Sequence, residues 1–139
     1  MQKIQNLDHL INLEWLDLSF NQIETIEGLE NLINLKDLSL YKNLIEEVPK
    51  NAFKTLEKYD LIQRLSVLSL AENKISDTSE LVQAVKKLPN LEVLTVKGNP
   101  LVNESEYKNI LLGNLENLKY LDYIYIDESS RKTGKVMRE

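Results

Sequence analysis

One apolar pattern returns along most of the chain. It has the form Leu-x-x-Leu-x-Leu-x-x-Asn-x-Leu, with Val or Ile at some of the Leu positions. Four copies begin at Leu13, Leu35, Leu65 and Leu91, and a degenerate fifth begins at Leu118. A unit this short cannot bury its apolar face alone, so consecutive copies must stack on one another. The pattern therefore predicts a solenoid in which each coil packs on its neighbours.

Each copy predicts a short strand followed by a turn. In the first copy, alternation directs Leu16 and Leu18 to the core, while Trp15 and Asp17 face the other way. Equivalent strands of stacked copies then form a parallel sheet. The shared asparagine follows each strand, where its amide can satisfy backbone groups that the bend leaves unpaired. We therefore interpret these asparagines as structural: Asn21, Asn43, Asn73 and Asn99.

The connections between the strands define the rest of the architecture. Leu13 and Leu35 are 22 residues apart, and apolar residues recur at every third position between them, which predicts a tight 3₁₀-like connection. The later copies are spaced by 30, 26 and 27 residues, so the extra residues are expected on the convex side. The prediction is an α/β solenoid: an arc with a parallel β-sheet on the concave face, short helices and 3₁₀ turns on the convex face, and a C-terminal cap.

Three of the longer connections contain candidate helices. The segment 49–59 has apolar positions that suit two helical turns. Asp77, with Glu80 three residues later, resembles a helix start ahead of an apolar stripe that Pro89 ends. Asn103 with Glu106 predicts a similar start.

We predict one domain over residues 1–127, with an incomplete first repeat at 1–12 and a cap at about 103–127. The tyrosines of the cap are expected to shield the last core layer. Ile4, Leu7 and Leu10 fit the convex arc of a preceding repeat whose strand is missing, so we expect a piece of a longer chain with an open edge at 13–18. The polar tail at 128–139 is expected to begin a linker or coiled coil.

Composition narrows the possible functions. The chain has no cysteine, which excludes disulfides, zinc–thiolate sites and thiol nucleophiles, and its single histidine, His9, is expected on the surface. The net charge is −5, from −7 over residues 1–127 and +2 over the tail. An acidic body argues against nucleic-acid binding, and the chain has no apolar run of about 18 residues that would span a bilayer. No metal or cofactor is expected.

At this spacing the sequence resembles the short class of leucine-rich repeats found in a nuclear regulatory subunit of protein phosphatase 1 and in axonemal dynein light chains. The stretches 12–29, 68–75 and 120–127 more narrowly resemble the repeat domain of the dynein regulatory complex subunit 3 family. That resemblance extends from Ile4 to Asp127. It implies a cytoplasmic, cytoskeletal subunit of the nexin–dynein regulatory complex in the axoneme of cilia and flagella. The family's earlier repeats and coiled coil are absent, and the insertion at about 50–60 departs from its pattern.

The outward positions of the strands are candidates for partner binding, because their side chains do not pack in the core. Exposed large aromatic residues are where binding hot spots concentrate. The alternative is that Trp15 and Phe20 cover the open edge or pack on a missing repeat. Two neighbouring carboxylates suggest either acid–base catalysis or an acidic face that steers a basic partner, and the lack of a histidine or metal triad favours the second. The candidate residues are Trp15, Asp17, Phe20, Asp37, Tyr41, Val67 and Val93.

We predict a non-catalytic protein–protein interaction domain in the axoneme, which recognises its partner with a rigid surface. By resemblance, the partners are other dynein regulatory complex subunits, axonemal dynein or microtubule-associated proteins, with no nucleic acid and no membrane. The alternative is a regulatory subunit of a protein phosphatase or a splicing particle. An enzyme such as a repeat-bearing ubiquitin ligase is disfavoured because it needs a thiolate. The basic tail is either a linker or a contact to acidic tubulin tails, and the oligomeric state stays open.

Overall fold

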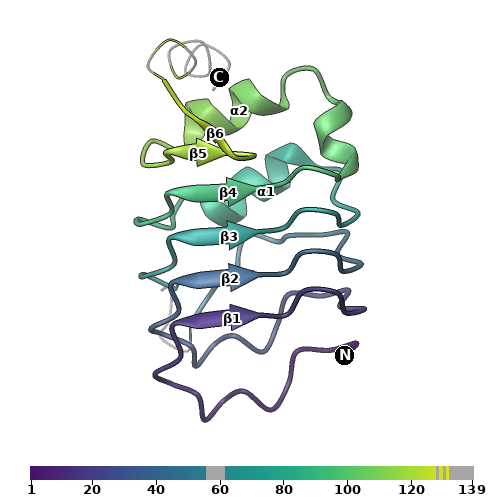
Figure 1. The fold of residues 1–139 in the computed structure, drawn as a ribbon, viewed down its shortest axis with the longest axis vertical. Helices are drawn as coiled ribbons and strands as arrows, with labels where there is room; N and C mark the ends of the chain where they lie inside the picture. Colours follow the sequence, from purple (N-terminus) through teal and green to yellow (C-terminus); the bar gives the residue numbers. More distant parts are fainter. Residues whose placement is uncertain (56–61, 128, 130, 132–139) are drawn as a thin grey trace.

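A computed structural model describes residues 1–55, 62–127, 129 and 131 of the chain. Six short strands form one sheet in sequence order, and the helices lie on one side of it (Figure 1). The first five strands run parallel and the sixth is antiparallel. The strands are β1 (Trp15–Asp17), β2 (Asp37–Ser39), β3 (Val67–Ser69), β4 (Val93–Thr95), β5 (Tyr120–Leu121) and β6 (Ile124–Tyr125).

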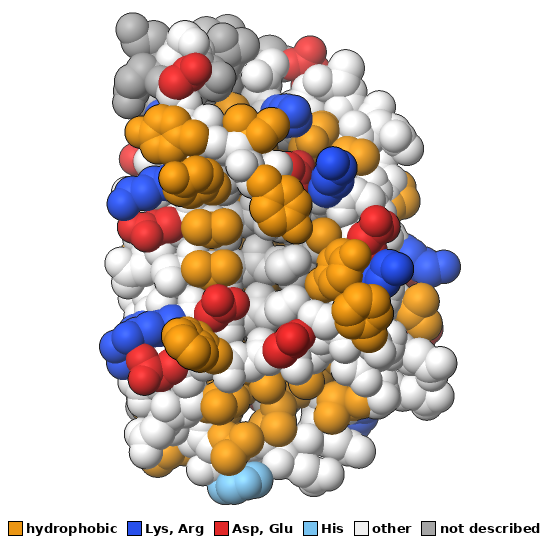
Figure 2. Space-filling view, in the orientation of Figure 1, with side chains coloured by type: hydrophobic (Ala, Val, Ile, Leu, Met, Phe, Trp, Pro, Cys, Tyr) orange, Lys and Arg blue, Asp and Glu red, His pale blue; other side chains and the backbone are white. Residues whose placement is uncertain are grey.

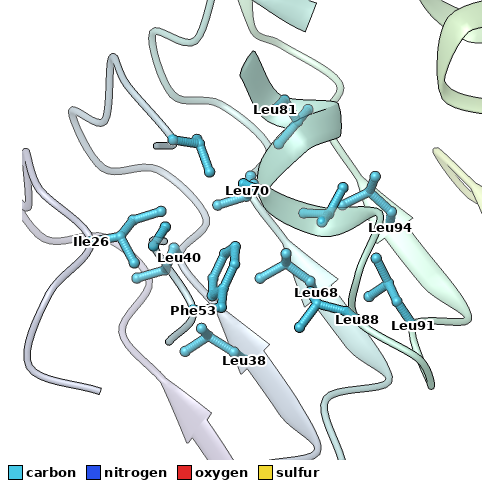
Figure 3. Packing of buried hydrophobic residues seen from close by; sticks show 14 of the residues in the cluster. Ile26, Leu38, Leu40, Phe53, Leu68, Leu70, Leu81, Leu88, Leu91 and Leu94 are labelled. Carbon is cyan, nitrogen blue, oxygen red and sulfur yellow. The ribbon is translucent and has the colours of Figure 1, made fainter. Parts of the chain in front are cut away.

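The leucines at the centre of each strand stack in register, as the repeat predicts. Leu16 pairs with Leu38, Leu38 with Leu68, Leu68 with Leu94, and Leu94 with Leu121. The inner members are fully buried, whereas Leu16 at the outer edge is half-buried. Burying one such side chain contributes about 1.5–3 kcal/mol. The stacked leucines, drawn in part in Figure 3, therefore supply much of the core energy and confirm the solenoid.

The first connection has no helix, and its backbone explains the three-residue apolar spacing. Leu32 donates to the carbonyl of Leu29, and Leu35 donates to that of Leu32, so the chain turns once every three residues. Within residues 1–55 and 62–127, helices lie in the longer connections. They are α1 (Thr78–Val85), the 3₁₀ helix η1 (Pro100–Asn103) and α2 (Tyr107–Asn114), and α1 packs against α2.

Asn43, Asn73 and Asn99 bridge consecutive coils, which confirms their structural role, while Asn21 donates to the carbonyls of Leu18 and Ser19 in its own turn. The buried Asn73 amide donates to the carbonyls of Leu40 and Leu70 at 2.9 and 3.0 Å. Its Oδ1 accepts from the backbone N–H of Ile45 at 3.0 Å. Asn43 and Asn99 make the equivalent bonds one coil earlier and one coil later. Each amide satisfies groups that the bend would leave buried and unpaired.

The N-terminal arc packs as the sequence predicts. Ile4 is buried, and Leu7 and Leu10 pack against the core cluster. Gly28 makes this contact possible, because a Cβ there would lie 2.4 Å from the carbonyl oxygen of Ile4. Its φ of +76° is also one that other residues rarely adopt.

The helix predictions are partly wrong. The described part of the segment 49–59 has turns and no helix; residues 56–61 lie outside the described residues. Phe53 instead points from this insertion into the core beside Leu38 and Leu68, fully buried (Figure 3).

At α1, Asp77 caps the helix as predicted, accepting from the backbone N–H of Glu80 at 2.9 Å. Glu80 does not close a capping box. Its Oε1 accepts from the N–H of Val48 in the preceding coil at 2.8 Å. Asn103 does not start a helix but ends η1, because Pro100 begins a 3₁₀ turn there.

At the C-terminal end the expected shielding role holds for Tyr107, which packs against the core cluster, but not for Tyr120, Tyr123 and Tyr125, which are exposed. Tyr123 and Tyr125 are 75% and 66% exposed on the β5–β6 hairpin. Leu111 and Leu112 on the buried side of α2 also belong to the core cluster at this end.

The predicted tail at 128–139 lies outside the described residues except for Ser129 and Arg131. The Arg131 guanidinium is not free in solvent: it donates to the carbonyls of Leu112, Leu115 and Leu118. Among the described helices, none has the length and apolar character needed to cross a bilayer.

Candidate functional site: the strand face

The side chains that point away from the core form a face on the concave side of the sheet, here called the strand face. Strand register places the third position of each repeat in one row. Figure 2 shows hydrophobic side chains along this row and acidic ones near its lower end. The row comprises Trp15, Asp37, Val67, Val93 and Tyr120.

Exposure varies along the row. Trp15 is 76% exposed, the highest value among the large hydrophobic residues that the structure describes as exposed. Asp37, Val67 and Val93 are half-buried between their neighbours. The indole of Trp15, with Leu13, Glu14 and Lys36, lines an open hollow beside β1. The N-terminal end of the strand face therefore combines a large apolar surface with a recess.

Asp17 lies two residues beyond Trp15 and is held in place by Ser19. The carboxylate Oδ1 accepts hydrogen bonds from both the backbone N–H and the hydroxyl of Ser19. These bonds hold the pKa of the Asp17 carboxyl below its usual range. The Ser19 and Ser39 hydroxyl oxygens are 2.8 Å apart, which links this turn to the next coil. Asp17 is therefore charged, exposed and oriented.

Asp37 has a different environment. Within the described ranges its carboxylate has no hydrogen-bond or ion-pair partner. Burial raises the pKa of Asp37, and the nearby charge of Asp17 raises it further. The sequence placed these two carboxylates on adjacent strands, and the structure brings them close enough to interact.

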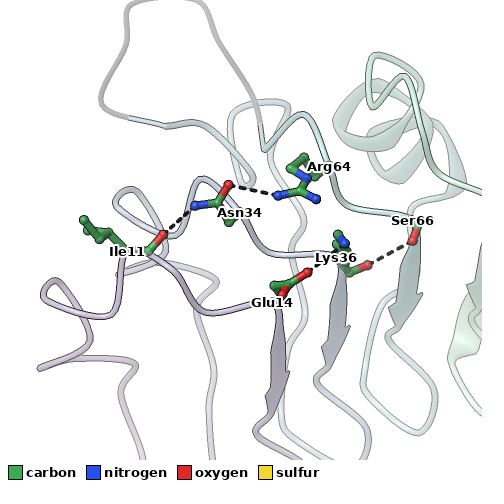
Figure 4. Close-up of polar contacts among 6 residues, drawn as sticks. All are labelled: Ile11, Glu14, Asn34, Lys36, Arg64 and Ser66. Carbon is green, nitrogen blue, oxygen red and sulfur yellow. Dashed lines mark hydrogen bonds and ion pairs between the residues drawn. The ribbon is translucent and has the colours of Figure 1, made fainter.

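The carboxylate of Glu14 next to this site is neutralised by the chain itself. Lys36 lies 2.7 Å from Glu14 and holds the pKa of that carboxyl below its usual range (Figure 4). Arg64 donates to the Asn34 side chain at 3.1 Å, and Asn34 donates to the Ile11 carbonyl at 3.0 Å. These contacts tie three coils together beside the hollow.

The three aromatic residues of the prediction do not form one cluster. The rings of Phe20 and Tyr41 meet edge to face at 5.3 Å, and Lys42 Nζ lies 5.6 Å from the Phe20 ring centre. In the part of the chain that the structure describes, no ring contact joins Trp15 to either. Phe20 has a φ of +59° and is 69% exposed, so this pair is a second feature at the carboxyl end of the strands.

A polar contact that sequence reasoning missed lies at the other end of the sheet. Asp122 Oδ1 accepts from the N–H groups of Val96 and Lys97 at 2.8 and 2.9 Å. Its Oδ2 accepts from the Tyr107 hydroxyl at 3.1 Å. Burial and this carboxylate together raise the pKa of Tyr107 to about 12. Because Tyr107 lies on a helix from a different connection, no local pattern signals the contact.

Among residues 1–55, 62–127, 129 and 131, no group of three or more His, Cys, Asp or Glu side chains is placed to hold a metal ion. The face offers an indole, two carboxylates and two valines instead, which suits contact with another chain.

Sequence comparison points to repeat proteins. The family described as "Leucine Rich repeats (2 copies)" matches residues 11–54. Leucine-rich repeat-containing protein 51 of Rattus norvegicus is 31% identical over 134 residues, which cover 96% of this chain and 54% of the relative. Leucine-rich repeat-containing protein 23 of Bos taurus is 32% identical over 139 residues, which cover all of this chain and 32% of the relative. The chain thus spans about half the length of the first of these relatives, and less of the second.

Solved structures share the fold. A chain of the Drosophila melanogaster SNF/U2A' complex is similar over the whole of this chain and 77% of its own length, with a TM-score of 0.84 at 23% identity. A chain of the TLR13–ssRNA13 complex is similar over 67% of this chain and 12% of its own length, with a TM-score of 0.59 at 38% identity. Together with the stacked register, these findings show that the chain folds as a leucine-rich repeat solenoid.

Proposed function

We propose that this domain binds its protein partner on the strand face, with Trp15 as the central anchor. The observation that carries this proposal is the exposure of Trp15, three-quarters of whose side chain is open to solvent on a rigid sheet. Tryptophan is enriched among the residues whose truncation costs an interface most. The recess beside it and the valines next in the row extend the apolar area. Stacked strands keep this surface in one shape, so little rearrangement is needed on binding.

We further propose that the assembly is the nexin–dynein regulatory complex of the axoneme. The support is the resemblance of the stretches 12–29 and 120–127 to the subunit 3 family. The domain would then act in the cytoplasm, in the cilium or flagellum. Its partners would be other subunits of that complex, axonemal dynein or microtubule-associated proteins.

The alternative, a regulatory subunit of a protein phosphatase or a splicing particle, rests on the same repeat architecture. The similarity to a chain of the SNF/U2A' complex suits it, since that repeat protein is part of a protein assembly. At 23% identity this is a likeness of fold, and so it weighs less than the sequence resemblance.

Affinity capture from an extract of motile flagella tests both levels of the proposal. The baits are the full chain, Trp15→Ala, and Ile33→Ala, which truncates another exposed hydrophobic residue, outside the strands. Captured proteins are identified by mass spectrometry, and circular dichroism confirms that each bait is folded. We expect the wild type and Ile33→Ala to enrich regulatory complex subunits, and Trp15→Ala to lose them.

Equal capture by all three baits would rule out Trp15 as the anchor. Enrichment of phosphatase or splicing proteins in place of axonemal ones would overturn the axonemal assignment and favour the alternative. If Trp15→Ala then lost those proteins, the result would still support the strand face as the binding surface.

A further inference from the structure

Carboxylates on the strand face are neutralised unevenly. At the second position of the first and fourth repeats, the chain supplies its own cation. Lys36 Nζ lies 2.7 Å from Glu14, and Lys119 Nζ lies 3.0 Å from Glu92. Asp17 and Asp37 lie on the same face, yet neither carboxylate forms an ion pair within the described residues. The end of the sheet with the most exposed aromatic residue thus holds two negative charges without a cation.

We propose that this end of the strand face binds an arginine side chain from an extended segment of the partner. This deepens the proposed function and rests on it. Trp15 lies directly opposite Asp37 in the strand pairing, and Asp17 is two residues further along β1 on the same face. Neighbouring strands are about 4.8 Å apart, so one guanidinium can contact the indole and both carboxylates.

The chemistry of the three groups selects arginine. A guanidinium is planar, stacks on an aromatic face and donates hydrogen bonds in a fork that matches carboxylates. A lysine ammonium is a compact, strongly hydrated charge that has neither the planar surface nor the fork of donors. Val67, next in the row after Asp37, offers an apolar surface for the aliphatic part of the incoming segment.

Asp17 and Asp37 favour binding of a cation for two different reasons. Ser19 orients Asp17 before binding, which lowers the conformational cost of forming the contact. Asp37 is partly desolvated and lacks a partner of its own, as the raised pKa of its carboxyl reflects. A cation placed here therefore gains an ion pair without displacing an existing one.

The only tryptophan of the chain makes the site directly measurable, because intrinsic fluorescence reports on Trp15 alone. The probe is the capped peptide Gly-Ser-Val-Arg-Val-Ser-Gly, titrated into the full chain. Matched peptides replace arginine with citrulline, which has nearly the same shape and no charge, or with lysine. We expect saturable quenching with the arginine peptide. The citrulline peptide should bind about tenfold more weakly, the loss expected for a charged hydrogen bond, and the lysine peptide should fall between them.

Two double variants remove equal charge from different places. Asp17→Asn with Asp37→Asn should bring the affinity for the arginine peptide down to that for the citrulline peptide. Glu24→Gln with Glu47→Gln, both exposed and outside the strands, should leave it unchanged. Equal binding of the arginine and citrulline peptides, equal losses in both double variants, or no saturable binding of the arginine peptide would each overturn the inference.

Failure of this inference is distinguishable from failure of the proposed function. If Trp15→Ala still abolishes partner capture while the asparagine pair leaves both capture and peptide binding intact, the strand face binds a partner without an arginine. If Trp15→Ala leaves capture unchanged, the proposed function fails first.

Discussion

The first and last repeats both have an aspartate at the fifth position, Asp17 and Asp122, and the two have opposite surroundings. Asp17 is exposed, and among the described residues it accepts hydrogen bonds from its close neighbour Ser19 alone. Asp122 is half-buried and accepts from two backbone N–H groups of the preceding coil and from Tyr107. Identical residues at identical repeat positions therefore do different work.

The difference shows that the two ends of the solenoid use their carboxylates for different purposes. At the C-terminal end, α2 brings Tyr107 over the sheet, and the aspartate closes the contact. At the N-terminal end the described residues bring no such distant partner to Asp17, which stays oriented by Ser19 and available. One end uses its carboxylate for stability, and the other leaves its carboxylates for a partner.

The largest expected effect tests this division directly. Asp122→Ala leaves two backbone N–H groups and a tyrosine hydroxyl without their acceptor, and we expect it to lower the free energy of unfolding by about 3 kcal/mol. Asp17→Ala removes an exposed side chain and should change it by less than about 0.5 kcal/mol. Urea denaturation followed by circular dichroism measures both. Similar losses for the two variants would contradict the comparison.

The next test extends the comparison to the end of the described chain. Arg131 donates to the carbonyl of Leu112 in α2 and to those of Leu115 and Leu118, which follow the helix. Arg131→Ala should therefore lower the free energy of unfolding by about 1.5 kcal/mol. Lys119→Ala breaks an exposed ion pair with Glu92 and should cost about 0.5 kcal/mol or less. If thermal unfolding places the two variants at the same melting temperature, Arg131 does not fasten this end.

The Tyr107–Asp122 contact also predicts a pH dependence. The pKa of Tyr107 is raised from 10.0 to about 12, so the folded state keeps its proton at a pH where the unfolded state has lost it. Its contribution to stability is therefore complete below about pH 10 and declines as pH rises through about 12. The difference in unfolding free energy between wild type and Tyr107→Phe should shrink over this range. A constant difference would show that burial and Asp122 do not raise the pKa of Tyr107 in the folded state.

The smallest expected effect is that of Asp37→Asn, which should raise the free energy of unfolding and not lower it. Because the pKa of Asp37 is raised, its charged form destabilises the fold above the ordinary range of an aspartate. Asp37→Asn should leave stability at pH 7 unchanged or raise it by about 0.3 kcal/mol, a value kept small by solvent screening. Differential scanning calorimetry at pH 7 and pH 3 checks the sign, since the gain should vanish when Asp37 is protonated. A clear loss of stability would assign Asp37 to the structure instead of the binding surface.

Sequence reasoning reached the features that repeat with the coil. The register of Leu16, Leu38, Leu68 and Leu94 and the bridging role of the asparagines follow from a period that every copy shares. It also placed five of the candidate residues on the strand face, although their role in binding stays a prediction: Trp15, Asp17, Asp37, Val67 and Val93. It failed where a contact belongs to one coil only. Phe53 enters the core from a turn expected to be helical, and Glu80 bonds to Val48 in place of closing a capping box.

The order of residues by itself determined that this chain stacks as a solenoid, since a short apolar unit has no other way to exclude water than to pack on copies of itself. Tertiary structure alone decided which carboxylates have a hydrogen-bond or ion-pair partner within the chain and which remain available to another molecule. A side chain's partner comes from whatever the neighbouring coil or helix brings beside it, and that neighbour lies many residues away along the chain. Asp122 meets Tyr107 and Glu14 meets Lys36, whereas Asp37 meets no cation of this chain among the described residues.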